Sequence, residues 1–186
     1  MSRWGLPTTI EISGVDYPIR TDFRDILTII QALTDPDLND QEKAIVLISI
    51  LYLERPEDLE TAIKKGMDFI AAGTEDDGKK RPVMMDWEQD YDIIIPAVNK
   101  VAGREVRGVE YLHWWTFVGY YMEIGESLFT QVLNIRQKRA KGKKLEKWER
   151  EFEKDNLKIV RLHKKLTEEE QAQREAELQA LKDLVG

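Results

Sequence analysis

The sequence contains no cysteine, only two histidines and no long apolar run. Without cysteine, the chain has no disulfide framework, no thiol nucleophile and no cysteine-based zinc site. Its most apolar stretch, residues 44–53, falls short of the roughly 18 apolar residues that a membrane span needs. The N-terminal residues show neither an apolar signal core nor a small-residue cleavage site. We therefore expect a soluble cytoplasmic protein with no membrane contact.

Several motifs that mark enzyme active sites are also missing. The chain has no phosphate-cradling glycine loop, no nucleophile elbow and no His-Glu-x-x-His zinc motif. Glu110 and His113 have the Glu-x-x-His spacing of di-iron bundles, but such a site needs a second pair. The other histidine, His163, has Val160 three residues before it. We expect His113 to be a packed partner of its tryptophan neighbours, and we expect no catalysis, no cofactor and no metal.

Four acidic residues crowd one predicted helix start, at Asp86, Glu88, Asp90 and Asp92. Paired carboxylates serve acid–base catalysis or bind divalent cations. These four lie in the first two turns of a predicted helix, where the helix dipole favours negative charge. The residue order of a calcium-binding EF-hand loop is absent. We interpret the four residues as a solvated acidic face.

The chain does contain enough apolar material for a core. Hydrophobic residues make up 42% of its 186 residues, with five Trp, six Tyr and five Phe, which excludes wholesale disorder. The net charge of −7 is uneven: residues 1–134 hold 13 Lys and Arg against 24 Asp and Glu, and residues 135–186 hold 15 against 11. The change of sign predicts a helical domain over 1–134 and a charged helical segment over 135–186.

The hydrophobic pattern predicts a mainly α fold, a multi-helix domain that opens with a small β-hairpin. Residues 8–12 and 15–19 alternate as two short strands around the turn residues Ser13-Gly14. The period then becomes helical, with Asp22 as an N-cap and with Asn39 and Glu42 as a capping box. The predicted helices span residues 23–33, 40–53, 56–72, 86–101, 109–122 and 127–137.

Three details of these helices give specific expectations. Helix 40–53 is apolar almost all round, which predicts that it is the central buried helix. Pro96 lies inside the fourth helix, where it costs about 3 kcal/mol, so we expect a break near Ile95. Pro56 suits the first turn of the third helix, whose predicted inner face holds Leu59, Ile63, Met67 and Ile70.

The charged C-terminal segment carries a heptad-like seam of apolar residues, and such a seam needs a partner helix. A capping-box pattern at Thr167 and Glu170 predicts one further helix start. Residues 144–185 fit either a helical hairpin or one long helix, and the seam predicts a homo-oligomer. The candidate oligomerisation residues are Leu145, Trp148, Phe152, Ile159 and Leu162.

Seven basic residues gather in segment 136–147, around Gly142. A run of this kind is typical of a phosphate-binding patch, which makes nucleic acid one candidate partner. The acidic last helix and the acidic domain 1–134 can instead neutralise the run, within one chain or in an oligomer. We favour neutralisation, because Phe129 is the only aromatic residue near the run before the seam begins.

The densest aromatic stretch covers residues 114–121, Trp-Trp-Thr-Phe-Val-Gly-Tyr-Tyr. On a helix these side chains cover more than half of the circumference, which is more than one core face absorbs. They fit either the core alone or the core together with a recognition surface, since aromatic anchors dominate many interfaces. The candidate partner-binding residues are His113, Trp114, Trp115, Phe117 and Tyr121.

One string, Leu-His-Trp-Trp-Thr-Phe at residues 112–117, is the most specific in the chain, and it is followed by Leu128-Phe129 and by Val-Leu-Asn-Ile-Arg at 132–136. Upstream stand Asp-Phe-Arg at 22–24 and the acidic string Asp-Trp-Glu-Gln-Asp at 86–90. In this combination the chain resembles the bacteriophage "gene product fifteen" family of phages and prophages of Gram-positive bacteria. The resemblance covers roughly residues 8–160.

That resemblance implies a helical tail assembly chaperone of a long-tailed phage. Its implied partners are the long hydrophobic tape-measure protein and the tail-tube proteins, in the cytoplasm of the bacterial host. The resemblance carries over no catalytic residue and assigns no role to His113, Trp114 or Trp115. The alternative is a nucleic-acid-associated phage protein that binds through segment 136–147.

Overall fold

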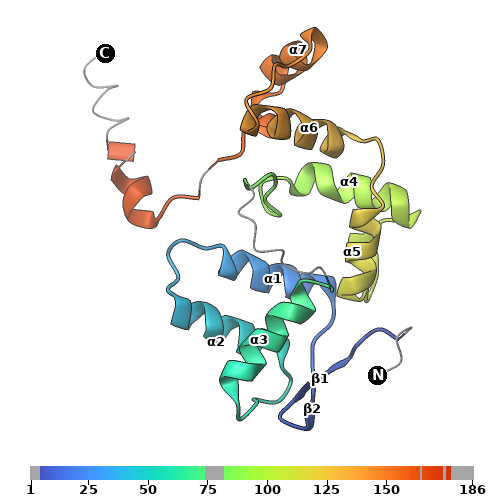
Figure 1. Cartoon of the computed structure of the whole chain (residues 1–186), viewed down its shortest axis with the longest axis vertical. Helices are drawn as coiled ribbons and strands as arrows, with labels where there is room; N and C mark the ends of the chain where they lie inside the picture. The colour runs from blue at the N-terminus through green and yellow to red at the C-terminus, as the bar shows by residue number, and fades with distance from the viewer. Residues whose placement is uncertain (1–4, 74–81, 164, 174, 177–186) are drawn as a thin grey trace.

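The computed structural model describes residues 5–73, 82–163, 165–173 and 175–176. The protein is mainly α with an N-terminal two-stranded hairpin, as the sequence predicted (Figure 1). The strands are β1 (Thr9–Ile12) and β2 (Val15–Pro18). The helices are α1 (Phe23–Leu33), α2 (Asp40–Leu51), α3 (Leu59–Ile70), α4 (Tyr91–Ala102), the 3-10 turn η1 (Val106–Gly108), α5 (Trp114–Met122), α6 (Leu128–Ala140), α7 (Lys147–Asp155) and α8 (Leu157–Val160).

The hairpin forms because apolar side chains alternate along β1 and a tight turn follows. Ile10 and Ile12 are buried in the core. Ile12 pairs with Val15 across Ser13-Gly14, whose φ angles of 50° and 85° suit the two-residue turns that match the twist of the strands. A two-stranded sheet is marginal in water, and contact between β1 and α3 stabilises this one.

Both predicted N-caps are present, but α2 is not the central buried helix. Asp22 Oδ1 accepts a hydrogen bond from Arg24 N at 3.0 Å, and the predicted capping box opens α2. That prediction of burial is wrong, since Leu47 and Leu51 are the buried residues of α2. A helix that is apolar on every side has no preferred face, so its contacts with α1 and α3 choose which stripe is buried.

α3 buries a different face from the predicted one. It begins only after its N-cap Asp58, so Pro56 precedes the helix rather than occupying its first turn. A Cβ atom at Gly66 would lie 3.0 Å from the Cδ2 atoms of Leu47 and Leu51, so the missing side chain lets α3 approach α2 closely. This contact rotates the buried face to Ala62, Gly66 and Phe69.

α4 runs through Pro96 without the predicted break. Pro96 is exposed, and the carbonyl group that loses a hydrogen bond is that of Asp92, an exposed residue in the first turn. Water can satisfy that carbonyl, so the helix stays straight enough to continue. The next helix begins later than predicted, because residues 109–113 run outside α5, with His113 as its N-cap.

The apolar seam of the C-terminal segment does not form one continuous helix. α7 ends at Asp155, and Asn156, with φ −124° and ψ 33°, separates it from the short α8. The seam residues serve the chain's own core instead: Leu145 is buried, and Phe152 and Ile159 pack against the core. Residues 147–160 therefore form neither a helical hairpin of the predicted kind nor one long helix.

Other C-terminal features agree better with the sequence. Thr167 N donates to Glu170 Oε2 at 3.0 Å, and a helix begins at residue 168, which confirms the predicted start. Residues 177–186, the rest of that predicted helix, lie outside the described residues. The sign change of charge after residue 134 falls inside α6.

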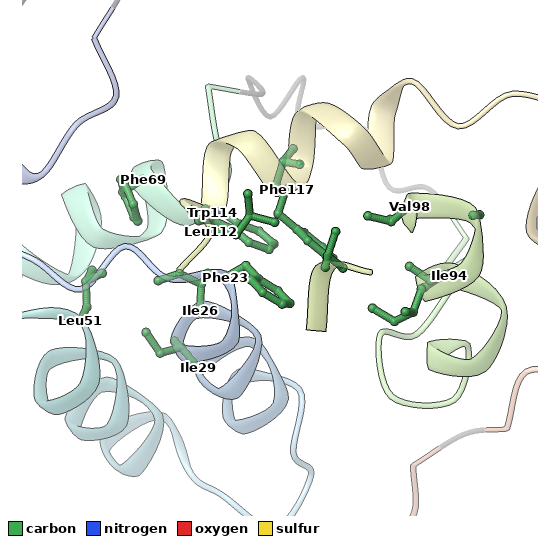
Figure 2. Packing of buried hydrophobic residues seen from close by; sticks show 14 of the residues in the cluster. Phe23, Ile26, Ile29, Leu51, Phe69, Ile94, Val98, Leu112, Trp114 and Phe117 are labelled. Atoms are coloured by element: carbon green, nitrogen blue, oxygen red, sulfur yellow. The ribbon is translucent and has the colours of Figure 1, made fainter. Parts of the chain in front are cut away.

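One part of the core lies where α5 packs against α1 and α4, and the same cluster extends to β1, α2, α3 and α6. Figure 2 shows Phe23 and Ile26 of α1 on one side of Phe117, with Ile94 and Val98 of α4 on the other. The rings of Phe23 and Phe117 stack with their centroids 4.6 Å apart. Such a pair contributes about 0.5–1.5 kcal/mol beyond the area it buries. Trp87, which precedes α4, packs against Trp114, Phe117 and Tyr121 of α5.

Candidate functional site

The backbone of the Leu-His-Trp-Trp string ties the start of α5 to the start of α1. Phe23 N donates to Leu112 O at 3.0 Å, and Trp114 N donates to Thr21 O at 2.7 Å. Leu112 N donates to Asp22 Oδ2 at 3.1 Å. Together these bonds form an isolated antiparallel bridge between two segments far apart in sequence.

His113 is only 3% exposed, and both of its ring nitrogens have partners. Nδ1 accepts from Trp115 N at 3.0 Å, and Nε2 lies 2.9 Å from Pro7 O. Because Nδ1 is an acceptor, Nε2 carries the ring proton and donates to Pro7 O. The ring is buried and held by these two contacts, as predicted for a packed histidine. Glu110 precedes α5, so the two residues do not share a helix face.

The two indole groups of the string cap the end of α3. Trp114 Nε1 donates to Ile70 O at 2.9 Å, and Trp115 Nε1 donates to Phe69 O at 3.0 Å. Both carbonyls belong to the last turn of α3, where carbonyl groups have no partner inside the helix. The Trp-Trp pair is therefore a structural link between α5 and α3.

The structure places the five candidate partner-binding residues mainly in the core. His113, Trp114 and Phe117 are buried. Trp115 and Tyr121 are half-buried and pack against the core. α5 thus uses most of its aromatic circumference for folding, by contacting α1 and α4 on different sides.

Trp87 extends this aromatic cluster to the surface. Its ring centroid lies 4.9 Å from that of Tyr121 and 6.1 Å from those of Trp114 and Phe117. Trp87 itself is half-buried, so one part of the ring packs inward and another is accessible. In the sequence, Trp87 stands out only as a member of the acidic string at 86–90.

A surface groove runs along α1, with Trp87 in its floor. It has two parts, with volumes of about 650 and about 500 Å³, and both are lined by Gln31, Trp87 and Glu88. Further lining residues of the larger part include Ile30, Val83 and Met85, and those of the smaller part include Phe23, Leu27 and Tyr91. Both parts are mostly apolar, and their shared lining residues place them next to each other beside α1.

Charged residues stand along the groove. The lining residues include the acidic Asp86, Glu88 and Asp92 and the basic Arg107 and Lys165. Asp86 Oδ1 accepts from the backbone N–H groups of residues 88 and 89, both at 2.9 Å, which shapes this turn. Three members of the predicted acidic face thus border an apolar surface.

The fourth member, Asp90, is not solvated, and that prediction is wrong for this residue. Asp90 is 1% exposed and forms a two-pronged ion pair with Arg136 of α6, at 2.7 and 2.8 Å. The remaining N–H groups of Arg136 donate to the carbonyl oxygens of Met84, Ile159 and Val160 at 2.7–2.9 Å. One guanidinium group therefore joins the groove wall to α6 and α8.

The basic run is partly neutralised within the chain. Besides Arg136, Lys138 Nζ donates to both carboxylate oxygens of Glu149 at 2.6 and 2.8 Å, and Arg139 pairs with Glu153. These hydrogen bonds hold the pKa values of both glutamates below their usual range. The neutralising groups come from α7 and the groove wall, whereas Lys141, Lys143, Lys144 and Lys147 are exposed.

A second apolar hollow lies between α2 and α3. Its volume is about 330 Å³, and Ile45, Ile48, Leu53 and Ile63 are among its lining residues. Ile45 is 63% exposed, in contrast to its predicted place at the centre. This hollow is smaller than either part of the groove, and its aromatic lining residue is Tyr52.

A comparison with known protein families identifies the chain. The family model described as "Bacteriophage Gp15 protein" matches residues 5–165. The chain belongs to the bacteriophage Gp15 family. The match confirms the resemblance carried by the Leu-His-Trp-Trp string. Comparison with curated proteins and with solved structures gives no match.

In this Gp15 family member, every residue that lines the groove falls within the matched range 5–165. Over the described part of the chain, no helix is long and apolar enough to span a bilayer, and no three His, Asp or Glu side chains gather as a metal site requires. Sequence reasoning missed the groove residues Val83, Trp87 and Gln89. The available signal was a tryptophan in the middle of an acidic string.

Proposed function

We propose that this Gp15 family member is a tail assembly chaperone of a long-tailed phage and catalyses no reaction. It binds the hydrophobic tape-measure protein and releases it as the tail-tube subunits assemble around that chain. Two kinds of support meet here: the role that the family resemblance implies, and a surface fitted to hold an apolar chain.

The observation that carries the proposal is the apolar groove along α1. Val83 is 75% exposed and Tyr91 is 40% exposed, beside the half-buried Leu27 and Ile30. An exposed apolar groove with a charged border is the kind of surface that binds protein partners. A hydrophobic tape-measure chain needs its apolar side chains shielded from water until the tube subunits surround it.

The floor of the groove is held rigid before a partner binds. Trp87 is supported from behind by Trp114, Phe117 and Tyr121. An aromatic anchor that is already ordered loses little side-chain entropy on binding, so more of its contact energy contributes to affinity. In this proposal Trp87 contacts the partner, and the predicted residues Trp114, Phe117 and Tyr121 support it from α5.

Two matched valine variants test the proposal. Val83→Glu places a charge in the groove, whereas Val15→Glu makes the same change on the exposed side of the hairpin. Both positions are exposed, so neither change should alter stability by more than about 0.5 kcal/mol. On co-expression with the phage tape-measure protein, the unaltered chain and Val15→Glu should capture it, and Val83→Glu should capture at least roughly tenfold less.

Equal capture by the two variants would place the binding surface outside the groove. If the unaltered chain captures no tape-measure protein but retards DNA in a salt-dependent way, the chaperone proposal fails and nucleic-acid binding through segment 136–147 replaces it.

A further inference from the structure

Beyond α8 the chain returns towards the loop between α1 and α2 (Figure 1). Residues 161–163 and 165–168 of this segment are named the strap. Leu162, His163 and Lys165 line the larger part of the groove. At the far end, Glu168 N donates to Asp37 Oδ1 at 2.9 Å. The strap thus lies on the same surface that the proposed partner would contact.

Gln89 holds the strap by its backbone. Its Nε2 donates to His163 O at 2.7 Å, and its Oε1 accepts from His163 N at 2.8 Å. In antiparallel β-strands, two opposite residues exchange both of their backbone hydrogen bonds. Here the side-chain amide of Gln89 takes the place of one of the two backbones. This grip contacts no side chain of the bound segment, so it suits an extended chain of any sequence.

Two strap side chains contact the groove in different ways. Leu162 is half-buried among its apolar lining residues. The Nζ atom of Lys165 lies 3.5 Å from Asp86 Oδ2 and 3.3 Å from Glu88 Oε2, and it donates to Thr34 Oγ1 at 3.3 Å. The acidic border of the groove therefore accepts a cation three residues after a leucine.

We infer that the strap is an internal stand-in for the partner, and that the groove binds an extended segment with a leucine followed three residues later by a lysine or arginine. Such a segment displaces the strap. This inference rests on the proposed function, because it names the chemistry of the partner at the same groove. The strap is held by exposed hydrogen bonds and ion pairs, which are individually weak, so a partner with more apolar contacts replaces it.

A labelled synthetic peptide of residues 160–169 of this chain is the probe. Fluorescence anisotropy measures its binding to three forms of the full chain: the unaltered chain, Lys165→Glu and Lys158→Glu. Lys165→Glu repels the strap from Asp86 and Glu88, and Lys158→Glu is the control. Lys158 is exposed on α8 and changes charge equally without lining the groove. Release of the strap raises the fraction of open groove, so Lys165→Glu should bind the peptide roughly five- to tenfold more tightly than the control.

Two further measurements separate the outcomes. The amide hydrogens of His163 and Glu168 should exchange faster in Lys165→Glu, and adding Gln89→Ala should reduce peptide binding roughly fivefold by removing the backbone grip. Equal or absent peptide binding in all variants overturns the strap inference, even if tape-measure protein is still captured. Tighter peptide binding by Lys165→Glu without any capture of tape-measure protein supports the inference and overturns the proposed function.

Discussion

The buried ion pair of Asp90 and Arg136 predicts a large loss of stability when one member is removed. Arg136→Met leaves the Asp90 carboxylate, which is 1% exposed, without its guanidinium partner. It also removes the donors to the carbonyl oxygens of Met84, Ile159 and Val160. Removing one member of a buried ion pair costs roughly 3–5 kcal/mol, because the other charge stays buried and unpaired. We expect Arg136→Met to lower the free energy of unfolding by about 4 kcal/mol.

Arg139→Met on the same helix is the matched control. The side chain of Arg139 is 56% exposed and pairs with Glu153, so its loss should cost at most about 1 kcal/mol. The double variant Asp90→Leu with Arg136→Met should recover at least about 2 kcal/mol of the loss, since no charge is then buried alone. Urea unfolding followed by circular dichroism measures all three. Equal stability of the two arginine variants would refute the reasoning.

Three other contacts lead to measurable outcomes. Burial raises the pKa of Tyr52 to about 12, so above pH 10 the unfolded chain loses a proton that the folded chain keeps. The free energy of unfolding should therefore fall by roughly 2 kcal/mol from pH 10 to 12. A fall of the same size in Tyr52→Phe would contradict this cause. Trp115→Phe keeps an aromatic ring but loses the hydrogen bond to Phe69 O. Urea unfolding should show a free energy of unfolding lower by about 1 kcal/mol, and an unchanged value would contradict the capping role. Self-association stays a prediction, and the seam residue Trp148, which is 53% exposed, is the one we expect to contact a second copy. Light scattering should show a smaller mass for Trp148→Ser than for the unaltered chain. A monomer both before and after the change would refute self-association.

Features that depend on neighbouring residues were predictable from the sequence. The hairpin, the caps at Asp22 and Asn39, and the start at Thr167 each involve groups within a few positions of one another. Their hydrogen bonds form in the same way in any fold, so local patterns suffice. The string that carries the family resemblance was equally visible, although its structural role was not.

Features that depend on distant contacts were not predictable. Asp90 and Arg136 are 46 positions apart, and each resembled a member of a like-charged cluster until the fold joined them. The buried face of α3 depends on how closely Gly66 lets another helix approach. The heptad spacing gives no sign of the helix end at Asn156, where the backbone angles leave the helical region. The break lets the seam residues pack onto the chain's own core.

The groove combines both kinds of feature. Its wall lies within the acidic string at 86–90, which was noticed as a helix start because acidic residues are common there. Its other side is α1, and residues 162, 163 and 165 line its end. His163 follows Gln89 by 74 positions. Only the fold places an apolar helix flank, an aromatic floor and a backbone grip on one surface.

Hydrogen–deuterium exchange of the chain alone and with the tape-measure protein tests the groove most directly. We predict slower exchange in α1 and in residues 83–92 of the complex, together with faster exchange at His163 and Glu168 as the strap is displaced. Protection confined to the hollow between α2 and α3, or to segment 136–147, with unchanged exchange along the groove, would contradict the account.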